Sequence, residues 1–152
     1  MTAINTVRVQ NADFDAGDEM SLLRSHSASI GAIASFVGVA RDLNNGDTVA
    51  TLELEHYPGM TEKSIEAIVA EASKRWLLLG TTVIHRVGKL LPSEQIVLVA
   101  VSSMHRAEAF QACEFIMDYL KARAPFWKKE LTTAGERWVD ARSSDHDSAE
   151  RW

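Results

Sequence analysis

The segment 118–130 concentrates basic and aromatic side chains in a chain whose net charge is −5. Four cations stand there against two acids, and the pair Phe126 and Trp127 separates the first two cations from the last two. Basic groups beside aromatic side chains suit a planar, anionic ligand. The alternative is a solvated helix end, because cations near a helix C-terminus are stabilised by the helix dipole. The four cations are Lys121, Arg123, Lys128 and Lys129.

Two further places have the residue types of an anion site. His105 and Arg106 follow a serine pair and stand at the start of a predicted helix, where backbone N–H groups and a nearby cation bind anions. The alternative is that His105 only caps the helix. Arg41 follows Gly38 at the end of a predicted buried strand, a common place for a ligand-facing arginine.

A predicted order of elements, β α β β α β β α β β, has to position these side chains. Strands are predicted over 4–9, 30–39, 49–56, 81–87, 95–101, 128–132 and 137–141, and helices over 15–26, 61–76 (with Thr61 as N-cap) and 105–124. The tight-turn sequence at 44–47 predicts that strands 30–39 and 49–56 form a β-hairpin. The polar residues from 143 onward are assigned to a tail. Because strands and helices do not alternate strictly, the α+β class with a mixed or antiparallel sheet is predicted.

Composition narrows the class of protein. The 152 residues, 46% hydrophobic and 24% charged, are typical of one globular domain. No apolar run approaches the ~20 residues that span a bilayer, and no signal peptide is visible. The single cysteine, Cys113, is predicted to be inert core; with no internal disulfide, the cytoplasm is the expected compartment. The acidic net charge disfavours nucleic-acid binding. The histidines lack metal-ligand spacing and no dinucleotide or P-loop motif occurs, so neither a metal nor a cofactor is expected.

Four runs of residues carry a family resemblance: 54–61 (LEHYPGMT), 83–88 (VIHRVG), the pair at 105–106 (HR) and 115–130 (FIMDYLKARAPFWKKE). They closely resemble the large, catalytic subunit of molybdopterin synthase. The similarity extends from about residue 30 to residue 152, and the run KARAPFWK at 121–128 is its most specific part.

The resemblance implies an α/β hammerhead-like two-layer fold as a single domain over 1–152, with a small antiparallel β-hairpin appendage at 128–142. It implies a sulfurtransferase of molybdenum cofactor biosynthesis. Sulfur would pass from the C-terminal thiocarboxylate of a small ubiquitin-like subunit ending in Gly-Gly to cyclic pyranopterin monophosphate, forming the dithiolene of molybdopterin. The implied assembly is a homodimer flanked by two small subunits, a heterotetramer. Carried over by motif, Lys121 and Lys128 are catalytic, and the substrate-binding positions are these two with Val39, Ala40, Arg41, His105, Arg106, Lys129 and Glu130.

The residue chemistry agrees with this implication. A thiocarboxylate is itself a nucleophile, so a chain with one predicted-buried cysteine can take part in sulfur transfer by positioning and acid–base help. Arginine and histidine at a helix start can hold the cyclic phosphate and stabilise a leaving oxygen. Lys121 and Lys128 can neutralise the thiocarboxylate, whereas Phe126 and Trp127 are expected to pack.

The spacing of His105 and Lys121 predicts a site shared between two copies of the chain. The two residues are 16 positions apart on one predicted helix, which is about 24 Å along the axis. A pterin-sized ligand does not reach both ends, yet the resemblance implies that both groups lie in one pocket. We therefore expect a two-fold axis to bring His105 and Arg106 of one copy toward Lys121 and Lys128 of the other. The alternative is a break in the helix, but no Gly or Pro lies from His105 to Ala124.

Two other classes of function stay open on the residues alone. One is a non-catalytic anion- or nucleotide-binding regulatory domain, which would use the arginines and His105 without requiring Lys121. The other is an RNA-binding module, which the net charge disfavours. Copurification of a small ubiquitin-like protein ending in Gly-Gly would discriminate between these classes and the sulfurtransferase.

Overall fold

The computed structural model describes residues 3–44, 46–139 and 143–152. Its main sheet has four strands in the order β1 (Ile4–Gln10), β5 (Leu78–Arg86), β7 (Gln95–Ser103) and β2 (Ala32–Val39). β1 and β5 are parallel, and the other neighbouring strands are antiparallel. Every residue of β5 is buried. A strand covered on both faces has this character, and β5 and β7 therefore form the centre of the sheet.

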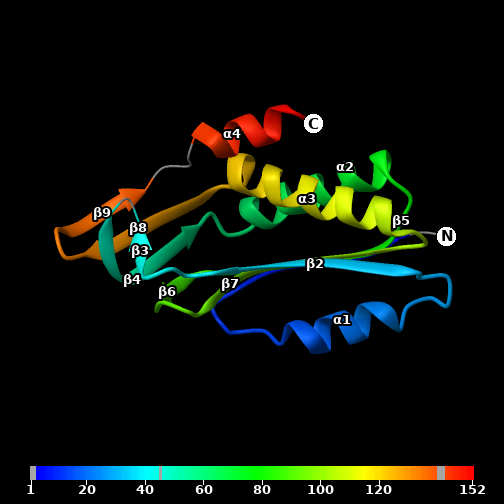
Figure 1. Ribbon diagram of the computed structural model, residues 1–152, viewed down its shortest axis with the longest axis horizontal. Coiled ribbons are helices and arrows are strands. Elements are labelled where there is room, and N and C mark those ends of the chain that lie inside the picture. The colour runs from blue at the N-terminus through cyan, green and yellow to red at the C-terminus, as the bar shows by residue number, and fades with distance from the viewer. Residues whose placement is uncertain (1–2, 45, 140–142) are drawn as a thin grey trace.

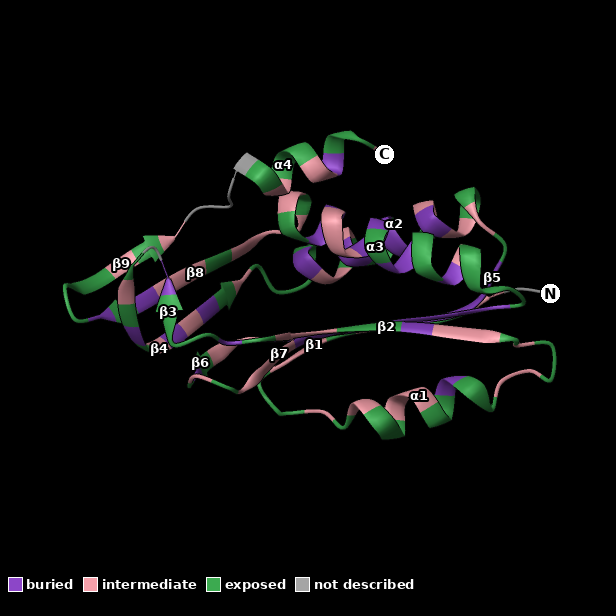
Figure 2. Ribbon diagram, in the orientation of Figure 1, coloured by how far each residue is buried: buried purple, intermediate pink, exposed green. Residues whose placement is uncertain are grey.

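Helices cover both faces of the main sheet (Figure 1). α2 (Met60–Arg75) and α3 (Arg106–Arg123) lie on one face, over a core that contains the fully buried Ile65, Val99 and Phe115. α1 (Ala16–Arg24) lies on the other face, where Leu23 packs with Ile84. Figure 2 shows the buried residues along the sheet and on the inner sides of α2 and α3. The predicted α+β class with a mixed sheet is confirmed, and α1 adds a third layer to the predicted two.

A second, antiparallel sheet extends from one end of the main sheet. Its strands are β3 (Leu43–Asn44), β4 (Asp47–His56), β8 (Phe126–Thr132) and β9 (Gly135–Val139), and β6 (Gly88–Leu90) pairs with β4 on the side. Leu52, Leu54 and Leu90 bury one face of this sheet together with Ala40. The expected hairpin appendage is present as β8 and β9, but it belongs to a larger sheet. The predicted second strand of that hairpin runs to 141, and residues 140–142 lie outside the described part of the chain.

The predicted hairpin between strands 30–39 and 49–56 is wrong. β2 pairs with β7 in the main sheet, whereas β4 pairs with β8 in the second sheet. The turn sequence instead joins β4 to the two-residue β3, with Asn44 opposite Asp47. A turn signal is local: it specifies that a hairpin forms there, but not how far the preceding strand continues into it.

Thr61 is not the N-cap of α2. The helix begins at Met60 with Gly59 as N-cap, and Glu62 accepts a hydrogen bond from the Gly59 N–H through Oε1 at 3.1 Å. Thr61 is buried in the first turn of the helix, as its second residue. It accepts from the Tyr57 N–H at 2.9 Å and donates to the Pro125 carbonyl at 3.0 Å. Thr61 therefore ties the start of α2 to the point where α3 gives way to β8.

The polar segment after residue 143 is a helix, not an extended tail. α4 (Ser143–Glu150) packs beside α3, and Trp152 meets Trp76 edge-on at 5.6 Å between ring centroids. Arg151 bridges to Asp118 at 3.0 Å and to Glu114. The helix was missed because its polar sequence carries little apolar periodicity, and contacts with α3 stabilise it instead. Among the described residues, no helix is long and apolar enough to span a membrane.

Candidate functional site

A cavity of about 360 Å³ lies where the last turn of α3 meets the second sheet. Pro125 ends α3 and sends the chain directly into β8, so the helix end and the strand start face the same space. The lining residues are Arg41, Asn44, Leu52, Leu54, His85, Ile96, Val97, Met117, Leu120, Lys121, Ala124, Phe126, Lys128, Val139 and Asp145.

Three predicted site residues meet in this cavity: Arg41, Lys121 and Lys128. They come from three different elements, the segment after β2, the last turn of α3, and β8. Asp145 of α4 adds one acidic group to the lining. The three cations line a half-apolar hollow of pterin size, and this arrangement suits an anionic ligand with a planar body.

Alternation along β8 decides which of its side chains reach the cavity. Phe126 and Lys128 line it, while Trp127 is 48% exposed. Lys129 faces away as well: its Nζ lies 3.9 Å from Glu53 and 4.0 Å from Glu136, and 5.5 Å from the Trp138 ring centre. The expectation that both aromatic residues pack is thus met by Phe126 and not by Trp127.

Glu130 lies on the same face of β8 as Lys128, but its carboxylate is buried and held by neighbouring side chains. It accepts from Asn44 Nδ2 at 3.0 and 3.1 Å and from Arg137 Nε at 3.2 Å. Arg137 also donates to Asp47 Oδ2 at 2.5 Å and to the Asn44 carbonyl at 3.0 Å. Because Asn44 lines the cavity, Glu130 supports the cavity wall from behind.

The end of β2 is fastened so that Arg41 follows at a defined place. The Ala40 N–H donates to the Glu94 carbonyl at 2.9 Å, and the Ala40 carbonyl accepts from the Ser93 N–H at 2.8 Å. Ala40 is buried, whereas Val39 is half-exposed. The backbone hydrogen bonds of Ala40 therefore fix the place where Arg41 follows the strand, and neither Val39 nor Ala40 lines the cavity.

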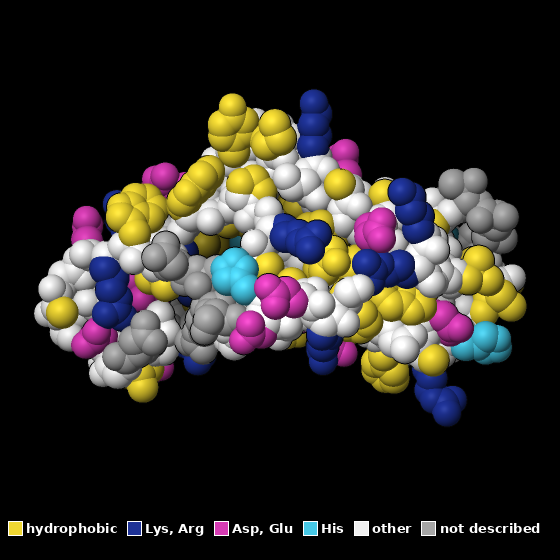
Figure 3. All heavy atoms as spheres, turned by 90° about the horizontal axis from the view of Figure 1, so that it is seen from above, with side chains coloured by type: hydrophobic (Ala, Val, Ile, Leu, Met, Phe, Trp, Pro, Cys, Tyr) yellow, Lys and Arg dark blue, Asp and Glu magenta, His cyan; other side chains and the backbone are white. Residues whose placement is uncertain are grey.

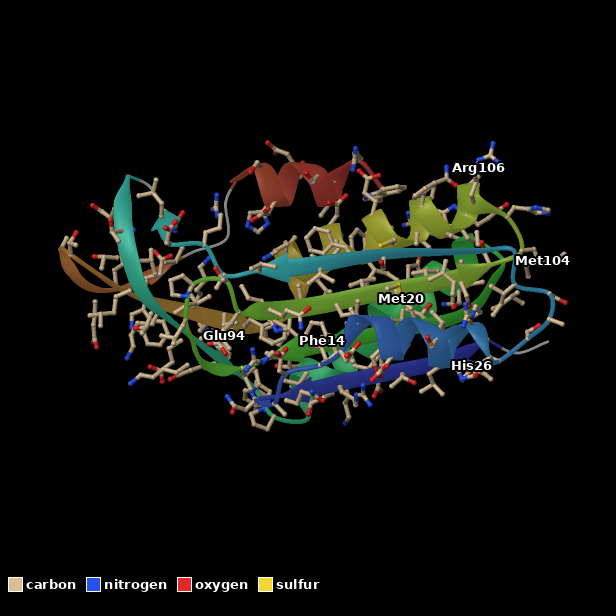
Figure 4. The ribbon with its side chains drawn as sticks, turned by 60° about the horizontal axis from the view of Figure 1, so that its bottom comes forward. Phe14, Met20, His26, Glu94, Met104 and Arg106 are labelled. Carbon is tan, nitrogen blue, oxygen red and sulfur yellow. The ribbon has the colours of Figure 1, made fainter. Side chains whose placement is uncertain are left out.

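His105 and Arg106 lie far from the cavity of their own chain. α3 is one continuous helix from Arg106 to Arg123, with His105 as its N-cap and both first residues exposed. Figure 4 shows Met104 and Arg106 at one end of the main sheet and Glu94 toward the end that carries the second sheet. His105 thus occupies the position that the capping alternative gives it, but within the described structure its side chain makes no capping hydrogen bond.

His85 is the main cavity residue that the sequence reasoning missed. It lies on β5, is buried, and stacks on Phe126 with ring centroids 3.8 Å apart and planes 19° apart. Burial lowers its pKa to about 4, with the nearby Lys121 charge acting in the same direction. The available signal is a histidine that directly follows the apolar pair Val83 and Ile84 on a predicted strand, but on the sequence alone it is considered only as a metal ligand.

Cys113 is not a candidate nucleophile. The thiol is buried on the core side of α3, and burial raises its pKa to about 11. It therefore stays protonated at neutral pH, in agreement with the prediction of an inert core cysteine.

Charge on the molecular surface gives no support to an extended nucleic-acid site. On the face seen in Figure 3, Lys and Arg side chains are interspersed with Asp and Glu rather than gathered into a stripe. Binding along a phosphate backbone favours a continuous basic surface.

Comparison with known proteins gives a consistent result. The family model of the MoaE protein matches residues 9–123. A molybdopterin synthase catalytic subunit from Ralstonia nicotianae is 62% identical over 147 residues, covering 97% of this chain and 84% of that protein. A molybdopterin biosynthesis MoaE protein from Burkholderia ambifaria has a solved structure with a TM-score of 0.85 and 56% identity, covering 98% of both chains. The molybdopterin synthase structure from Staphylococcus aureus has a TM-score of 0.79 at 31% identity, covering 86% of this chain and 94% of that one. The chain therefore belongs to the MoaE family, the family of the catalytic subunits of molybdopterin synthase, a sulfurtransferase of molybdenum cofactor biosynthesis.

Proposed function

We propose that the cavity beside the end of α3 is where this sulfurtransferase carries out its reaction. The substrate is cyclic pyranopterin monophosphate, and the sulfur donor is the C-terminal thiocarboxylate of a small ubiquitin-like subunit ending in Gly-Gly. The observation that carries the proposal is the convergence of Arg41, Lys121 and Lys128 from three elements on one cavity of about 360 Å³. Both proposed reactants are anions, and each needs a cation when it leaves water.

The roles of the three cations follow from their chemistry. Arg41 holds the phosphate, because a guanidinium offers paired donors to phosphate oxygens. Lys121 and Lys128 neutralise the incoming thiocarboxylate and place its sulfur against the substrate. The sulfur is the nucleophile, so the buried Cys113 is not required.

The small subunit is part of the proposal because the relatives are named catalytic subunits, which implies a further subunit in their enzymes. A flexible tail fits the site, since the cavity lies between a helix end and a sheet and its lining is partly apolar.

The active unit is proposed to be a homodimer with composite sites. His105 and Arg106 are exposed at the far end of the continuous helix α3. A second copy related by a two-fold axis would bring them to the cavity of its partner, where they add cations for the phosphate. The complete enzyme is then a heterotetramer of two such chains and two small subunits.

Reconstitution tests the function directly. The chain is mixed with thiocarboxylated small subunit and cyclic pyranopterin monophosphate, and dithiolene formation is measured. We expect Lys121→Ala to abolish product while its melting temperature stays near that of the wild type, because Lys121 is exposed in the last turn of its helix.

Lys74→Ala is the matched control. Lys74 is an exposed lysine in the last turn of α2 and does not line the cavity. Loss of product in Lys121→Ala with wild-type product in Lys74→Ala supports the proposal. Equal product from both variants contradicts it.

A further inference from the structure

We propose that His85 is a specificity-determining residue of the cavity, which presents a fixed hydrogen-bond acceptor to an N–H group of the bound heterocycle. The inference rests on the proposed function, because it concerns the substrate of the same cavity. The three cations account for the anionic parts of the two reactants, but a cation does not select a pterin ring. A neutral hydrogen-bond acceptor held at a fixed place can select a ring that carries an N–H group at the matching position.

The His85 ring is held on two sides. Phe126 covers one face, with centroids 3.8 Å apart and an interplanar angle of 19°. Nδ1 lies 2.8 Å from the Arg86 carbonyl oxygen. Neither contact uses Nε2, and His85 lines the cavity, so Nε2 is the ring nitrogen that is left to meet a ligand.

The contact at Nδ1 also decides the tautomer. A carbonyl oxygen only accepts hydrogen bonds, so Nδ1 carries the proton and donates it. Burial keeps the ring neutral, with a pKa of about 4, and the Lys121 charge opposes protonation further. Nε2 therefore has a lone pair at neutral pH and acts only as an acceptor.

A fixed acceptor in a cationic cavity divides recognition between two parts of the ligand. Arg41, Lys121 and Lys128 attract phosphate and thiocarboxylate, whereas Nε2 repels both and accepts only from a donor. A pterin ring system carries several N–H groups, and one of them placed at Nε2 orients the ring relative to the phosphate. An analogue with an acceptor at that position leaves two lone pairs facing each other, which disfavours binding.

Nitrogen NMR of the full chain labelled with ¹⁵N-histidine reads this contact directly. We expect the Nε2 resonance of His85, identified by its loss in His85→Phe, to hold the position of an unprotonated nitrogen from pH 5.5 to 8. Cyclic pyranopterin monophosphate should move it toward the protonated position, because accepting a hydrogen bond shifts it that way. Inorganic phosphate is the control ligand and should leave it in place.

Two variants separate recognition from structural support. His85→Phe keeps an aromatic ring against Phe126 and removes the acceptor, so we expect about tenfold weaker binding of the precursor and a fall in kcat/KM carried by KM. His85→Gln offers an amide oxygen as acceptor and should recover part of that loss. The melting temperature of each variant is measured together with its KM. If His85 has only a structural role, KM should rise in proportion to the loss of stability, and the acceptor of His85→Gln should give no recovery.

The outcomes distinguish this inference from the proposed function. If wild-type protein binds the precursor and forms product, but Nε2 does not move and both variants bind as the wild type does, the role of His85 is wrong and the proposed function stands. If the wild-type chain does not bind the precursor at all, the proposed function itself fails.

Discussion

Mixing two inactive variants tests whether the site is built from two copies of the chain. The perturbation is Arg106→Ala in one chain and Lys121→Ala in the other. The two residues lie at opposite ends of α3. The distance between them is about 22 Å along the axis, since they are 15 positions apart at 1.5 Å each. One precursor molecule does not contact both within a single chain.

The expected recovery follows from counting sites. After complete subunit exchange, about half of the dimers are mixed, and each mixed dimer has one intact site and one doubly defective site. We therefore expect about one quarter of wild-type activity from the mixture, whereas each variant alone is inactive.

The assay is dithiolene formation with saturating small subunit and precursor, after exchange has been verified by mass spectrometry of differently labelled chains. A double variant, Arg106→Ala with Lys121→Ala in one chain mixed with wild type, is the matched control. Both sites of each mixed dimer are then defective, so activity should fall to about one quarter, whereas sites formed within one chain would leave about one half. If verified mixed dimers of the single variants stay inactive, each site is formed within one chain and the reasoning from helix length is refuted.

Three further predictions concern single residues. Arg41→Ala should weaken precursor binding by about 1.5–3 kcal/mol, or about 10- to 150-fold in Kd, because a charge-assisted contact to phosphate is lost; calorimetric titration measures it, and an unchanged Kd contradicts the phosphate role. His85 has a pKa of about 4 in the folded chain against the ordinary 6.5, so its contribution to stability is complete above pH 6.5 and is lost as the pH falls toward 4. Urea unfolding should therefore show about 2 kcal/mol less stability at pH 5 than at pH 7 from this group, and His85→Phe should flatten that difference. Cys113→Ala should leave the rate of sulfur transfer unchanged and lower stability by about 1 kcal/mol through a small core cavity; a large fall in the transfer rate at unchanged stability would refute the inert role.

Local patterns in the sequence determined much of this protein. The apolar stripe that buries Cys113 and the stop at Pro125 specified α3. The strand predicted over 128–132 is present as β8, which begins two residues earlier at Phe126. The run at 115–130 also carried the family resemblance, and with it the expectation that Arg41, Lys121 and Lys128 act together. The prediction of α3 depends on neighbours within a few turns of the chain, whereas the grouping of Arg41 with the two lysines rests on the resemblance.

Only the tertiary structure decided which elements meet. Periodicity says that a face is buried but not what buries it, so the pairing of β4 with β8 rather than with β2 was not predicted. The contact between Asn44 and Glu130 spans 86 positions. His85 likewise became a cavity residue because a central strand ends beside Phe126, a ring contributed by a different sheet. Contacts of this kind depend on how the two sheets and α3 pack together, and that packing decides the chemistry available in the cavity.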